Sequence, residues 1–154
     1  MSDPHNLQRF VDAQKGVYES ACAELSAARK RGHWMWFIFP QLKELGRSAT
    51  AQFYGISGRE EAQAYLDHPI LGQRLRHCTQ LLLALQGHSI HDILGSPDDL
   101  KFRSCMTLFA HITEDNQAFV DAITEYYAGK FDDRTLELLN RKQPVAESTQ
   151  PTIT

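Results

Sequence analysis

The sequence predicts an all-α fold, an irregular single-domain bundle of about seven or eight helices. Apolar residues recur at spacings of three and four along most of the chain, helix-starting and helix-stopping residues flank these stretches, and strand-like alternation is nearly absent. The chain has 154 residues, 42% hydrophobic and 23% charged, which is typical of one globular domain. We expect that domain over residues 1–142 and a disordered tail over residues 143–154, where prolines and polar residues replace the apolar pattern.

The first helical stretch begins at Asp3-Pro4, where a capping residue precedes a proline. An apolar face then continues in helical steps until Gly32 marks a stop. Its members are Leu7, Phe10, Val11, Gln14, Tyr18, Cys22, Leu25 and Arg29.

The middle of the chain predicts two consecutive helices. Ser57 and Glu60 have the spacing of a capping box ahead of residues 61–66, and His68-Pro69 separates that helix from the next. The second helix has the clearest core-facing stripe in the chain, advancing by four, three, four and three residues until Gly87. The stripe consists of Leu71, Leu75, Cys78, Leu82 and Leu85.

Three further helices are predicted after residue 95. Ser96-Pro97 begins the first, with a capping serine, a proline at the first position and two acids in the first turn. Its buried side consists of Phe102, Cys105, Met106, Phe109 and Ile112. A helix follows from about residue 116 to Gly129, and Asp132 or Asp133 caps the last one.

Residues 33–41 form an aromatic segment that contains both tryptophans of the protein. Apolar side chains at nearly every consecutive position cannot share one face, so neighbouring helices must surround the segment. One interpretation is a central core helix. The other is that Trp34 or Trp36 walls a cleft, with His33 and Gln41 at its mouth, which would suit a planar ligand. The cations of residues 29–31 could then attract a phosphate, or could simply follow a helix end.

The string His33-Trp34-Met35-Trp36-Phe37-Ile38-Phe39-Pro40-Gln41 resembles an uncharacterised family of small helical proteins, a domain-of-unknown-function group often carried under the label calpastatin. Further matches, from Arg9-Phe10 to Ser104-Cys105-Met106, extend the resemblance over about residues 7–139. The resemblance implies an all-α fold and no established activity. The calpastatin label does not fit physically, because such inhibitors are disordered whereas this chain carries core-forming stripes.

The helix that begins at Ser96 has the most suggestive polar residues. At 100° per residue, Lys101 and Ser104 share one shoulder of its buried face, Asp99 and Arg103 share the other as an acid–base pair, and Thr107 lies on the far side. These residues could form a solvated face with hydroxyls bonded back to the chain. Alternatively, Lys101 is an anion ligand or electrophile, Ser104 or Thr107 donates to a substrate, and Asp98 or Asp99 supplies a carboxylate base.

The remaining motifs exclude several classes of site. His68 precedes a proline and could either face a cleft or cap a helix. His88 and His91 lack further metal ligands at a telling distance, so no metal site is expected. GxGxxG, GxxxxGK[ST], HExxH and GxSxG are all absent, and no cofactor is expected. The three cysteines, an odd number without a CxxC pair, behave as small buried hydrophobes.

We therefore hypothesise a small-molecule-binding domain or enzyme acting on a planar anionic metabolite, such as a nucleotide or an ADP-ribose-like compound. It requires a cleft lined jointly by residues 33–41 and the helix that begins at Ser96. The candidate catalytic residues are Asp99, Lys101 and His68. The candidate ligand-binding residues are Arg31, His33, Trp34, Trp36, Gln41, Ser48, Tyr54, Ser104 and Thr107.

The alternative hypothesis is a non-catalytic protein-interaction module, which predicts an exposed apolar patch in place of a pocket. A net charge of -3 and the lack of a known binding motif argue against nucleic acid as the partner. No apolar run reaches the ~20 residues that span a bilayer, so no membrane partner is expected. The N-terminus lacks the pattern of a secretory signal, which predicts a cytoplasmic protein. Nothing in the sequence indicates an oligomeric state.

Overall fold

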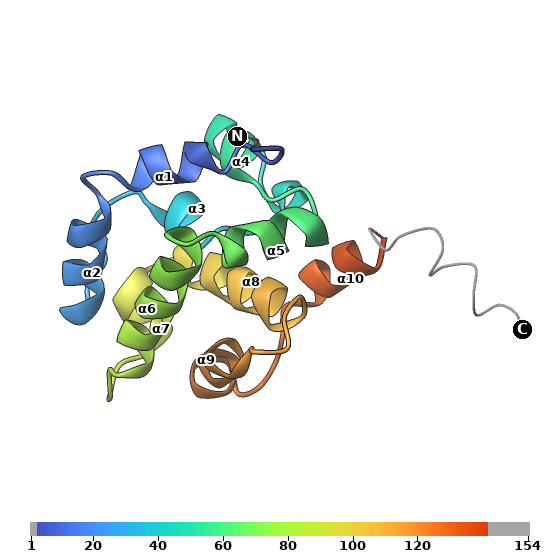
Figure 1. Cartoon of the computed structure of the whole chain (residues 1–154). Coiled ribbons are helices and arrows are strands. Elements are labelled where there is room, and N and C mark those ends of the chain that lie inside the picture. Colours follow the sequence, from blue (N-terminus) through green and yellow to red (C-terminus); the bar gives the residue numbers. More distant parts are fainter. Residues whose placement is uncertain (1–2, 142–154) are drawn as a thin grey trace, which may run out of the picture.

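The computed structural model describes residues 3–141, and this part of the chain is helical throughout (Figure 1). The predicted all-α class is confirmed. Within residues 3–141 there are ten α-helices rather than seven or eight, because short helices of four to six residues are too brief to show a period in the sequence. The predicted tail, residues 143–154, lies outside the described residues.

In chain order the helices are α1 (Gln8–Gln14), α2 (Tyr18–Ser26), α3 (Met35–Ile38), α4 (Ala49–Tyr54), α5 (Arg59–Asp67), α6 (Leu71–Leu83), α7 (Ile90–Leu94), α8 (Asp98–Ala110), α9 (Gln117–Tyr127) and α10 (Asp133–Arg141). One 3₁₀ turn, η1 (Lys43–Leu45), lies between α3 and α4. A single parallel bridge joins Leu42 to Ile56 on either side of α4. No described helix is long and apolar enough to cross a bilayer.

The predicted N-terminal helical stretch is interrupted at Gly16, whose φ of +77° is incompatible with a continuous helix. The chain therefore forms α1 and α2 in place of one long element. The predicted N-cap at Asp3 is wrong, because Leu7 occupies the N-cap position of α1 and Pro4 lies before the helix. The Asp3 carboxylate still accepts the N–H groups of Leu7 and Gln8 at 2.8 and 3.0 Å. The helix itself begins only at Gln8.

Two predicted capping serines do not cap. Helix α5 begins after Gly58 without a side-chain cap, and the Ser57 N–H instead donates to the Glu61 carboxylate at 2.9 Å. At the start of α8, Pro97 occupies the N-cap position, so Ser96 lies one residue too early. The spacing of residues predicts the start of both helices to within one or two residues. Which residue caps the helix depends on backbone angles that the spacing does not determine.

The buried apolar residues form one core around α8, which lies in the middle of the molecule and contacts α3, α7, α9 and α10 (Figure 1). The predicted stripe of α6 is buried at its first four positions, and Leu85 packs half-buried beyond the helix end. The aromatic segment is surrounded as predicted, because Trp34, Ile38 and Phe39 are each at most 2% exposed.

A buried polar network holds the aromatic segment from behind. The Phe37 carbonyl at the end of α3 accepts hydrogen bonds from Gln14 Nε2 at 2.7 Å and from the Tyr65 hydroxyl at 3.2 Å. Arg74 in turn donates to Gln14 Oε1 at 3.2 Å. These bonds connect α1, α3, α5 and α6, so the single turn of α3 is fixed by hydrogen bonds as well as by packing.

Candidate functional site

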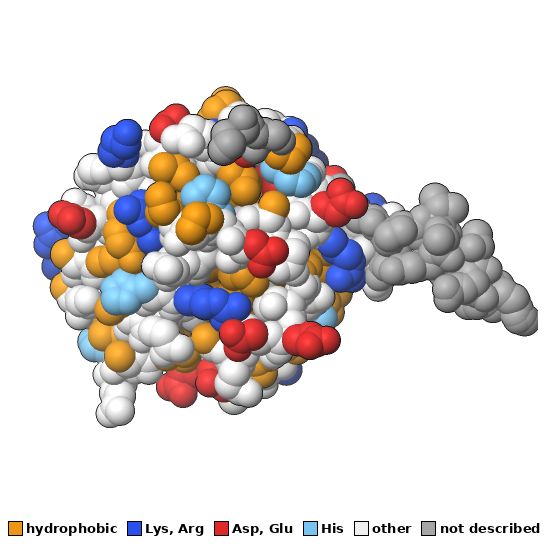
Figure 2. Space-filling model, in the orientation of Figure 1, with side chains coloured by type: hydrophobic (Ala, Val, Ile, Leu, Met, Phe, Trp, Pro, Cys, Tyr) orange, Lys and Arg blue, Asp and Glu red, His pale blue; other side chains and the backbone are white. Residues whose placement is uncertain are grey.

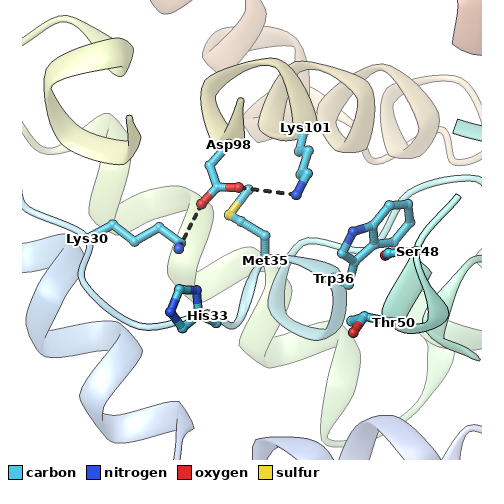
Figure 3. Close-up of a pocket in the computed structure, with 8 residues that line it drawn as sticks. All are labelled: Lys30, His33, Met35, Trp36, Ser48, Thr50, Asp98 and Lys101. Atoms are coloured by element: carbon cyan, nitrogen blue, oxygen red, sulfur yellow. Dashed lines mark ion pairs between the residues drawn. The ribbon is translucent and has the colours of Figure 1, made fainter. Parts of the chain in front are cut away.

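The structure places a pocket of about 240 Å³ where the loop before α3, the start of α4 and the first turn of α8 meet (Figure 3). We call it the Asp98 pocket. It is lined by Lys30, His33, Met35, Trp36, Ser48, Thr50, Asp98 and Lys101. The aromatic segment and the helix after Ser96 therefore line one cleft together, which is the juxtaposition that the ligand-binding hypothesis requires.

One carboxylate holds two ammonium groups in this pocket. Asp98 Oδ2 lies 2.7 Å from Lys30 Nζ, and Asp98 Oδ1 lies 3.4 Å from Lys101 Nζ. Figure 3 shows the two lysines reaching Asp98 from opposite sides. Because two positive charges face one negative charge, the pocket keeps an excess of positive charge that favours an anion.

Lys30 is held in place by tertiary contacts that cannot be predicted from the sequence. Its backbone N–H donates to the Ile93 carbonyl at 2.8 Å, which ties the loop after α2 to α7. Its side chain is only 6% exposed, and Nζ lies 4.9 Å from the centre of the Trp34 ring. The ammonium also donates to the Gly32 carbonyl. Lys30 is thus a fixed cation at the inner end of the pocket.

Trp34 and Trp36 have different environments. Trp34 is buried, and its indole N–H donates to the Glu24 carboxylate at 3.0 Å. Burial alone would raise the pKa of Glu24, but this bond and two backbone N–H bonds outweigh it and lower the pKa. Trp36 is also buried, at 7% exposed, but it lines the pocket, and its ring fits against Gly46, where an added Cβ would lie 2.7 Å from Trp36 Cζ2.

The outer wall of the pocket is polar. Ser48 caps α4, with its Oγ accepting the Ala51 N–H at 3.1 Å, and Thr50 follows in the first turn. Both residues are exposed, as is His33 on the other side of the opening. In Figure 3 these groups surround the mouth, with Met35 and Trp36 between them. An aromatic face, two cations and polar groups at the mouth are therefore brought together.

Two candidate catalytic residues lie outside the Asp98 pocket. His68 caps the next helix, since its Nδ1 accepts the N–H groups of Ile70 and Leu71 at 3.1 and 3.3 Å. Asp99 turns away toward His91, with 3.3 Å between Oδ2 and Nδ1. The predicted pairing of Asp99 with Arg103 is wrong, because the Arg103 guanidinium donates to the carbonyls of Lys130 and Phe131.

Six of the nine candidate ligand-binding residues also lie outside it. Gln41 and Ser104 line a second pocket, and Trp34 is buried against Glu24. The other three are Thr107, Tyr54 and Arg31. Thr107 is fully buried, donates to the Arg103 carbonyl at 2.8 Å and accepts the Asp132 N–H at 2.9 Å. The far side of α8 is therefore covered by the start of α10, where the sequence predicted an open face. Tyr54 packs among phenylalanine rings, and Arg31 is an exposed residue next to the pocket-lining Lys30.

A second pocket, of about 320 Å³, lies on the other side of Lys101. We call it the Gln41 pocket. Its lining residues are Gln41, Leu45, Pro97, Leu100, Lys101, Ser104, Asp132 and Arg134. The Ser104 hydroxyl there donates to the Leu100 carbonyl at 3.2 Å and to Asp132 Oδ2 at 3.3 Å. The candidate residues thus divide, with His33, Trp36 and Ser48 at one pocket, Gln41 and Ser104 at the other, and Lys101 at both.

No pattern in the sequence marks Thr50 as a lining residue, because it belongs to no motif. Met35 lies within the aromatic segment, where the sequence predicts that only the tryptophans, His33 and Gln41 face a cleft. Within residues 3–141, no three His, Cys, Asp or Glu side chains are grouped as a metal site would need.

Known proteins give the chain a family but no activity. A family model described as a protein of unknown function (DUF1810) matches residues 4–139. The crystal structure of the conserved hypothetical protein Rv1873 from Mycobacterium tuberculosis is similar, with 58% sequence identity and a TM-score of 0.89. The similarity covers 90% of this chain and 99% of that one. Among curated proteins, none matches the chain.

Proposed function

The chain belongs to the DUF1810 family, whose function is unknown, and we propose that it binds a planar anionic small molecule in the Asp98 pocket. The observation that carries this proposal is the bridge from Asp98 to both Lys30 and Lys101 beside the Trp36 ring. An anionic group would lie on the ammonium of Lys101, which is less buried than that of Lys30. A planar ring would then lie against Trp36.

The size of the pocket narrows the ligand class. Its volume of about 240 Å³ is slightly below the ~300–1,000 Å³ of typical small-molecule sites. One ring with one anionic group, as in a mononucleotide, would fill it. A larger ADP-ribose-like compound would extend through the mouth past His33 and Thr50. We therefore propose that the ligand is a nucleoside monophosphate or a molecule of similar size. We also propose that the protein binds it in the cytoplasm.

The proposal assigns binding roles rather than a reaction. Of the candidate acid–base residues, Asp98 and Lys101 line the Asp98 pocket, and they are paired with each other. The Lys101 ammonium is assigned to the anion, Trp36 to the ring, and the hydroxyls of Ser48 and Thr50 to polar groups at the mouth. Lys30 and Asp98 position Lys101 by holding a fixed charge beside it.

A thermal-shift titration with adenosine monophosphate, and with uncharged adenosine as the comparison, tests the proposal. At ~100 times its dissociation constant, a ligand adds about 2.7 kcal/mol to the free energy of unfolding. We expect the monophosphate to raise the melting temperature and adenosine to have a much smaller effect. Lys101→Ala and Trp36→Phe should weaken the response, whereas Lys15→Ala, an exposed lysine outside both pockets, should leave it unchanged.

The proposal fails if neither mononucleotides nor small aromatic acids shift the melting temperature. It also fails if Lys101→Ala and Lys15→Ala respond alike, since a general charge effect would then explain the binding. The alternative, a protein-interaction module, would need exposed apolar side chains gathered in one patch. The exposed large apolar residues Phe53, Ile70 and Leu100 lie on different elements, at α4, before α6 and on α8, which does not favour it. Figure 2 shows apolar and charged side chains interspersed on the face it presents.

A further inference from the structure

Gln41 carries a buried amide group without a partner. The residue is 2% exposed, and among the described residues its Nε2 has no hydrogen-bond acceptor. Its backbone carbonyl accepts the Ile56 N–H at 2.9 Å, so the chain at Gln41 is held while the side-chain amide remains unpaired. Buried polar groups without partners are rare in folded proteins, and each one calls for a physical reason.

The surroundings of this amide are those of a binding site. Gln41 lines the Gln41 pocket, whose volume of about 320 Å³ is within the ~300–1,000 Å³ of small-molecule sites. Leu45, Pro97 and Leu100 give it an apolar side. Leu100 is 57% exposed, so its side chain is accessible to a ligand that enters the pocket.

The charges around the pocket favour a carboxylate. Lys101 and Arg134 line it together with one acidic group, Asp132. Arg134 is paired with Glu137 at 2.8 Å, whereas Lys101, 3.4 Å from Asp98, shares that carboxylate with Lys30 and is therefore only partly compensated. Asp132 Oδ2 accepts the Thr135 N–H at 2.9 Å, the Thr135 hydroxyl at 2.5 Å and the Ser104 hydroxyl at 3.3 Å, and so caps α10. The groups left for a ligand carboxylate are therefore the unpartnered Gln41 amide and the partly compensated Lys101 ammonium.

We infer that the Gln41 pocket binds a small amphipathic acid. The ligand carboxylate accepts a hydrogen bond from Gln41 Nε2 and pairs with the Lys101 ammonium. The apolar body of the ligand covers Leu45, Pro97 and Leu100. This inference shares Lys101 with the proposed function, and it differs from it in the pocket, in the lack of an aromatic wall and in the ligand class.

Octanoate is the probe that tests the inference, with 1-octanol and octylamine as neutral and cationic probes of the same length. In ¹H–¹⁵N NMR titrations, the side-chain amide signals of Gln41 should shift and saturate with octanoate. Octanol and octylamine should bind at least about tenfold more weakly, because a buried donor and a cation prefer a carboxylate.

Two variants separate binding from folding. Gln41→Leu removes the unpaired amide and keeps its shape, so it should abolish octanoate binding while leaving the free energy of unfolding equal or higher. Leu100→Ser should weaken octanoate by about tenfold through lost apolar contact. Phe53→Ser is the matched control, because Phe53 is 54% exposed and lies on α4, outside the Gln41 pocket.

Several outcomes would overturn the inference. Octanol binding as tightly as octanoate is one of them. Another is an equal effect of Leu100→Ser and Phe53→Ser on octanoate binding. If Gln41→Leu lowers stability and retains octanoate binding, the amide has only a structural role. If octanoate does not bind and Leu100→Ser lowers the oligomeric mass measured in solution, the exposed leucine belongs to an interface between copies of the chain. Because Lys101 lines both pockets, the residues unique to each separate the two proposals: Gln41→Leu should affect octanoate and not adenosine monophosphate, and Trp36→Phe should do the reverse.

Discussion

Asp98 Oδ2 lies 2.7 Å from Lys30 Nζ, and the side chains of the two residues are only 19% and 6% exposed. The pair connects the loop after α2 to the first turn of α8, two segments far apart in the sequence. A charge with so little access to water depends on its partner, since removing one member leaves the other buried and uncompensated. The same pair therefore supports the fold and forms the inner end of the Asp98 pocket.

Asp98→Asn should lower the free energy of unfolding by about 3 kcal/mol, at the low end of what loss of a buried ion-pair partner costs. Chemical denaturation monitored by circular dichroism measures this. Asp115→Asn is the matched control, because Asp115 is 88% exposed and lies 3.8 Å from Arg76, and it should change stability by less than about 0.5 kcal/mol. Equal effects of the two variants would contradict a structural role for the Lys30–Asp98 pair.

Glu24 should make stability depend on pH in the acid range. Hydrogen bonds from the Trp34 indole and two backbone N–H groups outweigh its burial and hold its pKa below the ordinary value of 4.5. A carboxyl group whose pKa is lowered in the folded state stabilises the protein above its unfolded pKa. That contribution is lost as the pH falls from about 4.5 through the folded pKa.

Melting temperatures of the wild type and Glu24→Gln between pH 3 and pH 7 check this. The variant should be less stable at pH 7, and the difference should shrink as the pH falls below about 4.5. Glu114→Gln, at an exposed turn residue, should not change the pH profile. A difference between the wild type and Glu24→Gln that stays constant down to pH 3 would show that the hydrogen bonds do not depend on the charge.

The cysteines should differ sharply in reactivity. Burial raises the pKa of the Cys78 thiol, and it raises that of Cys105 well above its usual range, so both remain protonated and unreactive at pH 8. Cys22 is only partly buried. Native protein treated with iodoacetamide should gain one label, at Cys22, and unfolded protein should gain three, as intact-mass measurements would show. Native labelling of Cys105 would mean that the α8 core opens readily.

Gly72→Ala should destabilise the protein even though it lies within a helix. Alanine has the higher helix propensity, by ~1 kcal/mol, and propensity alone would predict stabilisation. A Cβ at Gly72 would overlap the carbonyl oxygen of Leu66, where α5 approaches α6. We expect the free energy of unfolding, measured with denaturant, to fall by about 2 kcal/mol. Displacing the Leu66 backbone destabilises the protein by more than the higher helix propensity of alanine stabilises it. A gain in stability would show that the two helices can separate freely.

The long helices could be predicted because their apolar residues repeat over enough turns to reveal a helical period. The stripe that includes Leu75 and Leu82 gives α6, and Phe102 with Phe109 gives α8. The interruption at Gly16 and the short helices α4 and α7 could not be predicted in the same way. A single glycine inside a helical pattern is compatible with continuation, and five or six residues carry no measurable period.

The segments that contribute to the candidate site could be predicted from the sequence, but the way in which they come together could not. The sequence indicates that Trp36 and Lys101 belong to notable segments, and the structure brings both to one pocket. It does not indicate which cation of residues 29–31 turns inward. That choice depends on the bond between the Lys30 N–H and the Ile93 carbonyl, a tertiary contact across about sixty residues. Asp99 faces away for a related reason, since it meets His91 of α7.

The hydrogen bonds from Gln14 and Tyr65 to the Phe37 carbonyl have a consequence for the kinetics of ligand binding. They fix α3, the helix that carries Trp36, so the aromatic wall is already in place before any ligand arrives. A preorganised wall spares the ligand the entropy loss of ordering it. Association at the Asp98 pocket should then be limited by diffusion and charge, and differences in affinity among ligands should lie in how fast they leave.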